Sequence, residues 1–271
     1  MNKIVIILVL SFFSTVAFAQ RIEQNAVPAV VLNAFQLKYP SAEDVSWKKE
    51  KANYLVYYKV NTKPHKLRMD YKGESIDHFQ DLFLSEIPRE VLTTIKGKIS
   101  NFDLKDADLE ERNGVSTYVT KFNTNGSNSY FWVSEKGELL KYRQEIREDE
   151  IPSPIVSFIN SQYGKIKIER AKYVEDNGTN NYIIGGKING KTNVFWFNTN
   201  NNMLKHTQDL KLSDIPESIK KVLRVDYKGF ELRDADMIHV KDSQTYTIRL
   251  KSTNEEVRVT FDKYGKTLEL N

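Results

Sequence analysis

The sequence predicts an α+β protein built as four tandem αββββ repeats, with helices packed on one face of antiparallel four-stranded sheets. Three observations favour this fold class: a 64-residue period, one apolar stripe of helical spacing in each period, and short alternating runs after each stripe. Each period therefore reads as one helix followed by about four strands.

The 64-residue period appears in aromatic, proline and turn positions alike. The aromatic set consists of Tyr54, Tyr118, Tyr182 and Tyr246. The proline set consists of Pro88, Pro152 and Pro216, with Pro28 fitting after a short deletion. The turn set consists of Gly73, Gly137, Asn201 and Gly265. Agreement across residue classes with unrelated chemistry indicates that one structural unit is repeated.

Residues 1–19 are typical of a secretory signal. Lys3 precedes an apolar run from Ile4 to Phe13, and Ala17-Phe18-Ala19 fits the small-x-small cleavage pattern. The alternative is a membrane anchor, which needs about 20 apolar residues, whereas Ser11 interrupts this stretch. We therefore expect cleavage after Ala19, no membrane span in the mature chain, and a periplasmic or extracellular location.

The composition narrows the class of protein. A formal net charge of +4, which falls by one without Lys3, is too slight to indicate a nucleic-acid partner. The chain has no cysteine, which excludes disulfides, thiol catalysis and thiolate metal sites. A secreted fold without disulfides must therefore be held together by its hydrophobic core.

The helix of each period is expected at an Ile-Pro step. Ser85, Asp149 and Ser213 precede these steps and are typical helix-start residues, with proline in the first turn. Apolar residues then recur four apart and predict one buried helix face per period. They are Val31, Phe35 and Tyr39; Val91, Ile95 and Ile99; Ile155, Ile159 and Tyr163; Ile219, Leu223 and Tyr227.

The strands after each helix carry apolar residues on both faces. Alternate positions that are consistently apolar should face the helix. These include Tyr54, Val56, Tyr58, Phe131, Val133, Phe195 and Phe197. Tyr130 and Trp132 alternate with Phe131 and Val133, so we expect them on the helix-free face. Asp70 and Gly73, like Asp262 and Gly265, fit the first and last positions of a type I turn.

Four motifs of this chain resemble the PepSY-like family of secreted bacterial proteins. They are Val45-Ser-Trp47, Tyr54-Leu-Val-Tyr57, Met69-Asp-Tyr-Lys-Gly73 and Ile87-Pro-x-x-Val91. The fold of that family is similar to that of the β-lactamase inhibitory protein (BLIP). The resemblance implies that the repeats pair into two PepSY-like or BLIP-like domains, at 20–146 and 147–271, with a concave sheet surface. In the inhibitor that surface grips a protein. This chain lacks the inhibitor's cysteines, so no contact residue is carried over.

Several motifs suggest chemistry that their context does not favour. Gly185 to Thr192 matches the phosphate-binding pattern G-x-x-x-x-G-K-T, but a strand follows it where a helix is required. Asp106 and Asp108 could suggest a cation site, yet the residues one period later are Arg170 and Lys172. A solvated strand start around a buried alanine is the better interpretation.

No catalytic centre is recognisable. The four histidines, His65, His78, His206 and His239, form no metal-binding motif and are interpreted as surface residues. No nucleophile elbow is present either. We therefore expect no enzyme activity, no cofactor and no metal.

The helix-free face is the candidate binding site, because aromatic residues interleaved with arginine and lysine often dominate protein interfaces. The predicted binding residues are Leu55, Tyr57, Lys121, Tyr130, Trp132, Trp196, Arg249 and Arg258. The first hypothesis is a protein or peptide partner, with inhibition of an enzyme as one form of it. The alternative is an envelope glycan stacked on the tryptophans. A third interpretation is that these aromatics pack within the molecule or a dimer.

Overall fold

The computed structural model describes residues 20–99, 103–124 and 126–270. The predicted signal, residues 1–19, lies outside the described residues. The α-helices are α1 Ala29–Lys38, α2 Arg89–Lys98, α3 Ser153–Tyr163 and α4 Glu217–Asp226. A short 3₁₀ helix precedes each of them: η1 Gln24–Ala26, η2 Leu84–Glu86, η3 Glu148–Glu150 and η4 Leu212–Asp214.

One strand, β1 Gln20–Ile22, precedes α1, and four strands follow each helix. After α1 come β2 Glu43–Glu50, β3 Asn53–Val60, β4 Lys63–Met69 and β5 Ser75–Asp81. After α2 come β6 Asp103–Arg112, β7 Val115–Thr124, β8 Ser127–Ser134 and β9 Leu139–Ile146. After α3 come β10 Lys167–Asp176, β11 Thr179–Ile188, β12 Lys191–Asn198 and β13 Met203–Asp209. After α4 come β14 Glu231–Val240, β15 Ser243–Lys251, β16 Glu256–Asp262 and β17 Thr267–Leu270.

All of these strands belong to one 17-stranded sheet. Each strand pairs antiparallel with the next strand in the chain, and this includes β5–β6, β9–β10 and β13–β14, which join strands on either side of a helix. The predicted fold class, four tandem αββββ repeats with separate four-stranded sheets paired as two domains, is therefore wrong. Backbone hydrogen bonding continues across every expected break. The division of the chain at 146/147 stays a prediction.

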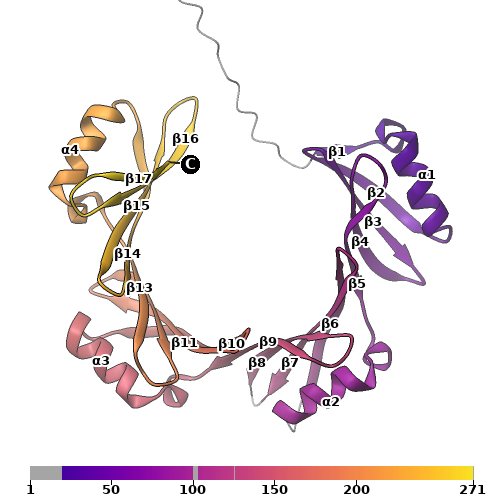
Figure 1. Ribbon diagram of the computed structural model, residues 1–271, viewed down its shortest axis with the longest axis horizontal. Helices are drawn as coiled ribbons and strands as arrows, with labels where there is room; N and C mark the ends of the chain where they lie inside the picture. Colours follow the sequence, from indigo (N-terminus) through magenta and orange to yellow (C-terminus); the bar gives the residue numbers. More distant parts are fainter. Residues whose placement is uncertain (1–19, 100–102, 125, 271) are drawn as a thin grey trace, which may run out of the picture.

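The sheet curves into an open ring with the helices on its outside (Figure 1). β1 and the β16–β17 hairpin lie on either side of the opening, so the two ends of the sheet approach each other. The side of the sheet without helices lines the inside of the ring. We call this side the inner face. A sheet of this length must curl because each strand is twisted relative to its neighbour.

Each α-helix begins directly after a proline. Pro88 is the N-cap of α2, and Ser85 lies earlier, within η2. The prediction that Ser85, Asp149 and Ser213 start the helices is therefore wrong, because these residues lie in the preceding 3₁₀ turns. The carboxylate of an acidic residue in the 3₁₀ turn accepts a hydrogen bond from the backbone N–H three residues earlier. Glu86 accepts such a bond from the Phe83 N–H at 2.8 Å.

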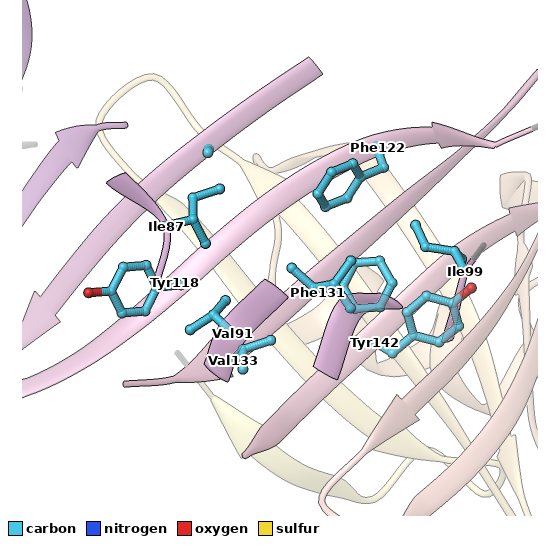
Figure 2. Close-up of a cluster of buried hydrophobic side chains, with 10 residues drawn as sticks. Ile87, Val91, Ile99, Tyr118, Phe122, Phe131, Val133 and Tyr142 are labelled. Atoms are coloured by element: carbon cyan, nitrogen blue, oxygen red, sulfur yellow. The ribbon is translucent and has the colours of Figure 1, made fainter. Parts of the chain in front are cut away.

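The core lies between each helix and the strands beneath it. Under α2, Val91 and Ile95 are fully buried against Phe122, Phe131 and Val133 (Figure 2). Comparable clusters lie under the other three helices, and they include the predicted inward-facing residues Val56, Phe195 and Phe197. The alternation that predicted the helix-facing positions is thus confirmed.

Histidine provides a correction. His65, His78 and His206 are buried at 8%, 6% and 1% exposure, so their interpretation as surface residues is wrong. His65 follows the same alternation as Leu67 and Met69, which places it on the helix side of β4. His65 Nδ1 lies 3.1 Å from His78 Nε2, and His78 Nδ1 lies 2.9 Å from Glu111 Oε2. Hydrogen bonds between these rings make their burial tolerable.

Candidate binding face

The inner face is built by strand alternation around β8. Because Phe131 and Val133 point to the core, Tyr130 and Trp132 point to the inner face, where both are half-buried. Their cross-strand neighbours are Val119 and Lys121 on β7 and Lys141 and Arg143 on β9. Two aromatic rings and three cations thus share one small area of the sheet.

Arg143 connects the two rings of this group. The Tyr130 and Trp132 rings stack with centroids 6.4 Å apart. The Arg143 guanidinium carbon lies 3.9 Å from the Tyr130 centroid and 5.8 Å from that of Trp132. Lys121 lies 5.6 Å from Tyr130 on the other side. Contact between cations and ring faces fixes these side chains while leaving their N–H groups available.

Trp196 and Tyr57 lie on the same face but apart from this group. Trp196 on β12 is half-buried beneath Lys205, whose ammonium lies 4.8 Å from the ring centroid. Tyr57 on β3 is half-buried and contacts Lys48 at 5.1 Å. Four strand spacings of about 4.8 Å separate β8 from β12, so Trp132 and Trp196 lie roughly 19 Å apart along the sheet. The predicted aromatic residues therefore share a face without forming one continuous patch.

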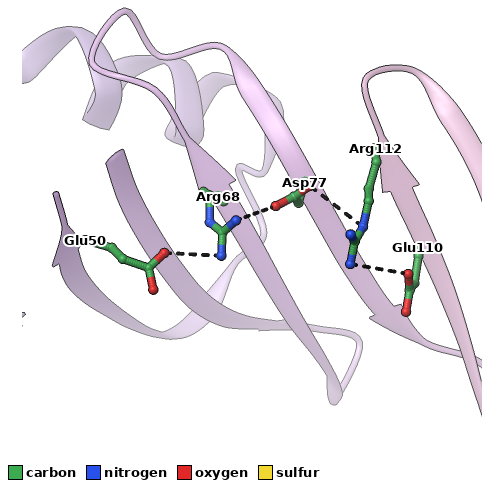
Figure 3. A network of polar contacts seen from close by, with 5 residues as sticks. All are labelled: Glu50, Arg68, Asp77, Glu110 and Arg112. Atoms are coloured by element: carbon green, nitrogen blue, oxygen red, sulfur yellow. Dashed lines mark hydrogen bonds and ion pairs between the residues drawn. The ribbon is translucent and has the colours of Figure 1, made fainter. Parts of the chain in front are cut away.

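Leu55 is a correction to the predicted set. Its side chain is only 4% exposed, so it offers no contact surface to a partner. Its cross-strand neighbour Arg68 reaches across β3 and forms an ion pair with Glu50 at 3.2 Å. Arg68 also contacts Asp77 at 2.8 Å, and Asp77 in turn meets Arg112 (Figure 3). This end of the inner face is thus covered by ion pairs between its own residues.

Arg249 and Arg258 lie near the other end of the sheet. They are cross-strand neighbours on β15 and β16, and they line a hollow of about 380 Å³ together with Asp234, Asp236 and Glu269. Arg249 lies 3.9 Å from Asp234 and 3.7 Å from Glu256. Both predicted arginines are therefore distant from the tryptophans, and Arg249 already has carboxylate neighbours.

Sequence reasoning missed the cations at the centre of the inner face. Arg143, Arg170 and Lys172 come from β9 and β10, and Lys172 pairs across the strands with Glu145. Burial, followed by the charges of Arg143 and Arg170, lowers the pKa of Lys172. The sequence did contain a sign of these cations, because the aspartates at 106 and 108 become Arg170 and Lys172 one period later. That change of charge was interpreted only as evidence that these positions are exposed to solvent.

Acidic groups lie on either side of these cations. On β5 and β6, burial together with the charges of Asp106 and Asp81 raises the pKa of Asp108 to about 6. On β13 and β14, burial together with Asp234 and Asp209 raises the pKa of Asp236. Ala107 and Ala235, between the paired aspartates, are buried as expected. The inner face thus alternates between acidic and basic areas.

Other predicted and excluded sites can be placed in the fold. Gly185 to Thr192 spans β11, a turn and β12, as expected, with Asn189 and Gly190 both at positive φ. Within the described ranges, no group of three or more histidine, aspartate or glutamate side chains is arranged to hold a metal ion. None of the helices in those ranges is long and apolar enough to cross a membrane.

Comparison with known proteins gives only partial structural similarities. No family model and no curated sequence matches the chain. A DUF2874 family protein from Bacteroides ovatus is similar at a TM-score of 0.38 and 20% identity, over 43% of this chain and 86% of that one. A BLIP-like protein from Bacteroides fragilis gives 0.38 and 18%, over 46% and 91%. A proposed periplasmic protein from Bacteroides eggerthii gives 0.38 and 18%, over 44% and 88%.

Proposed function

We propose that this protein is a non-enzymatic binding protein of the periplasm or the cell exterior, and that its inner face holds a protein or peptide partner. An inhibitor of a secreted enzyme would be one protein of this kind. Membership of the PepSY-like family belongs to the same proposal, on the sequence pattern alone. The location rests on the signal-like residues 1–19.

One observation carries the proposal. Tyr130, Trp132 and Trp196 remain half-buried on the side of the sheet that no helix covers. Each ring has a cation against it, and Val119 and Ile183 lie opposite the two tryptophans on one neighbouring strand, so the rings are held in place without being sealed in the core. Large, rigid aromatic side chains bury much area on binding at a small loss of side-chain entropy.

Site-specific photocrosslinking in cells tests the proposal. A benzophenone amino acid at Tyr57 or Thr247 samples the inner face, and the same group at Leu37 or Val225 samples the exposed outer side of α1 and α4. We expect a discrete adduct from the inner positions only. Adducts from the outer positions alone would contradict the proposal.

A pair of variants connects the adduct to the aromatic residues. Trp132→Ala with Trp196→Ala should weaken capture about thirtyfold or more, because truncation of a central interface aromatic typically costs about 2 kcal/mol. The matched control is Leu37→Ala with Val225→Ala, which should leave capture unchanged. Circular dichroism should show that both double variants are folded. Titration of tryptophan fluorescence with envelope polysaccharides distinguishes the glycan alternative, which requires a shift that the tryptophan variants abolish.

A further inference from the structure

The centre of the inner face carries cations that form no close ion pair with another described residue. Among the residues that the structure describes, no carboxylate oxygen lies within 4.0 Å of the cationic groups of Arg143, Arg170 or Lys172. Glu145 is the cross-strand neighbour of Lys172, but its carboxylate accepts a hydrogen bond from Asn128 at 2.8 Å. Within the described part of the chain, three cations therefore lie on two neighbouring strands without an ion pair within 4.0 Å, and Glu145, whose charge opposes the lowering of the Lys172 pKa, is held by Asn128.

Equivalent positions in the chain lack this excess of positive charge. One period earlier, the strand pair is Asp106 opposite Lys121, and one period later it is Asp234 opposite Arg249. Between them, Arg170 stands opposite Gly185, so the acid has become a base and the partner side chain is gone. Folding alone does not require this exchange, because the other two pairs fold with opposite charges.

Gly185 has a specific effect on Arg170. A Cβ at position 185 would lie 2.7 Å from Arg170 Nε and 2.9 Å from its Cγ. The arginine therefore lies across the strand in space that Tyr57, Lys121 or Arg249 fills at the equivalent positions. The absence of a side chain at 185 leaves room for Arg170 to lie close to the sheet over β11, while Arg143 lies on the other neighbour of β10, strand β9.

We propose that this part of the inner face, the cationic centre, binds a short acidic segment of a protein partner; this inference rests on the proposed function. The cationic centre consists of Tyr130, Trp132, Arg143, Arg170, Lys172 and Trp196. Carboxylates of that segment would pair with the guanidinium groups, and its apolar side chains would cover the rings. Arg143, which is held against the rings of Tyr130 and Trp132, is poised for such a contact, since little of its side-chain entropy remains to be lost.

The surrounding charges favour a protein segment over a uniform polyanion. Asp106 and Asp108 lie on β6 and Asp234 and Asp236 on β14, each four strands and so roughly 19 Å from Arg170 and Lys172 on β10, and two strands from the tryptophans on β8 and β12. An extended polyanion crossing the face would meet one or both acidic areas. A partner with a compact acidic projection flanked by neutral or basic residues avoids this repulsion.

Selection from a displayed library of random 12-residue peptides tests the inference. Panning against the wild-type protein should enrich peptides with clustered Asp and Glu. Fluorescence anisotropy of the best peptide should show at least tenfold weaker binding to Arg170→Asp with Lys172→Asp, which introduces the residues found at the equivalent positions 106 and 108. Gly185→Ala, which displaces Arg170 without changing charge, should weaken binding severalfold.

The matched control is Lys96→Glu with Lys221→Glu, which makes the same charge change on the exposed outer side of α2 and α4. Binding to this variant should stay within about twofold of wild type. Enriched peptides that need Trp132 and Trp196 but are not acidic, or that bind the Arg170 and Lys172 variant equally well, would overturn the acidic-segment inference and leave the proposed function standing. Polygalacturonate that binds at this centre more tightly than the peptides would also overturn it. Peptides indifferent to the tryptophans, or no enrichment at all, would count against both.

Discussion

The pair formed by Asn193 and His206 predicts how the stability of the protein changes with pH. His206 is 1% exposed, its ring stacks on Phe195 at a centroid distance of 4.3 Å, and Tyr163 packs on its edge at 4.5 Å. Its Nε2–H donates to Asn193 Oδ1 at 2.8 Å, while the Asn193 amide nitrogen donates to the Lys191 carbonyl oxygen. His206 Nδ1 has no partner among the described residues, so a proton added there would find no acceptor.

Burial, followed by the charge of His239, lowers the pKa of His206 from 6.5 to about 4. The folded protein therefore holds this ring neutral, and the unfolded chain binds more protons between pH 6.5 and 4. Stability contributed by His206 is fully present above pH 6.5 and is lost as the pH falls toward 4. Linkage gives a loss of about 2 kcal/mol at pH 5 and about 3 kcal/mol at pH 4, relative to high pH.

The perturbation is Asn193→Val with His206→Leu, which introduces the apolar residues found 64 positions later, Val257 and Leu270. Urea unfolding followed by tryptophan fluorescence at pH 7, 6 and 5 gives the free energy of unfolding of both proteins. We expect the wild type to lose about 2 kcal/mol more than the variant between pH 7 and pH 5. Asp108, whose raised pKa makes an opposite contribution as pH changes, is common to both proteins and cancels in the comparison.

His239→Gln is the control, because it removes the smaller cause of the lowered His206 pKa and leaves the burial of His206, the larger cause, so most of the pH dependence should remain. If the wild type and the Asn193 and His206 variant lose stability in parallel, to within about 0.5 kcal/mol, the argument that the fold holds His206 neutral is refuted. A difference between the two proteins that does not change with pH would reflect packing alone.

Two further predictions concern stability. Gly137 has φ +82°, and a Cβ there would lie 3.0 Å from the Glu90 carbonyl oxygen of α2. Gly137→Ala should therefore lower the free energy of unfolding by about 1–2 kcal/mol more than Gly190→Ala, because Gly190 shares the positive φ but has open space around it. Equal losses of the two variants in urea unfolding would exclude a role for the helix contact. Asp77→Asn removes the anion between Arg68 and Arg112, so it should lower the free energy of unfolding by about 1–2 kcal/mol in low salt and by less in 1 M NaCl. Asp44→Asn, which breaks an exposed ion pair with Lys59, should change stability little. A loss for Asp77→Asn that does not depend on salt would rule out the electrostatic explanation.

The sequence predicted what depends on local alternation. Helix-facing residues such as Phe131 and Val133, and the inner-face position of Trp132, follow from strand periodicity alone. The same period of two puts His65 on the core side, whereas the surface interpretation of the histidines rested only on the lack of a metal-binding motif and is wrong. Helix starts were shifted by three residues because a 3₁₀ turn precedes each proline.

Pairing between strands was the information that the sequence did not contain. Nothing in an alternating run says whether β5 hydrogen-bonds to β6 across the intervening helix, so separate sheets were expected where one sheet exists. The cationic centre was missed for the same reason. Arg143 meets Tyr130 only through the β8–β9 register, and Lys172 meets Glu145 only through the β9–β10 pairing.

The two sides of β6, β10 and β14 differ in what folding requires of them. Their helix-facing alanines, Ala107, Ala171 and Ala235, are all buried, at 3%, 7% and 1% exposure. The residues that flank these alanines are aspartates in β6 and β14 but Arg170 and Lys172 in β10. The helix-facing side is therefore alike in all three places, and the difference lies on the inner face, where Gly185 stands opposite Arg170 while Lys121 and Arg249 stand opposite the aspartates. The inverted charge is thus a property of the inner face, and it is the property that the proposed acidic segment would complement.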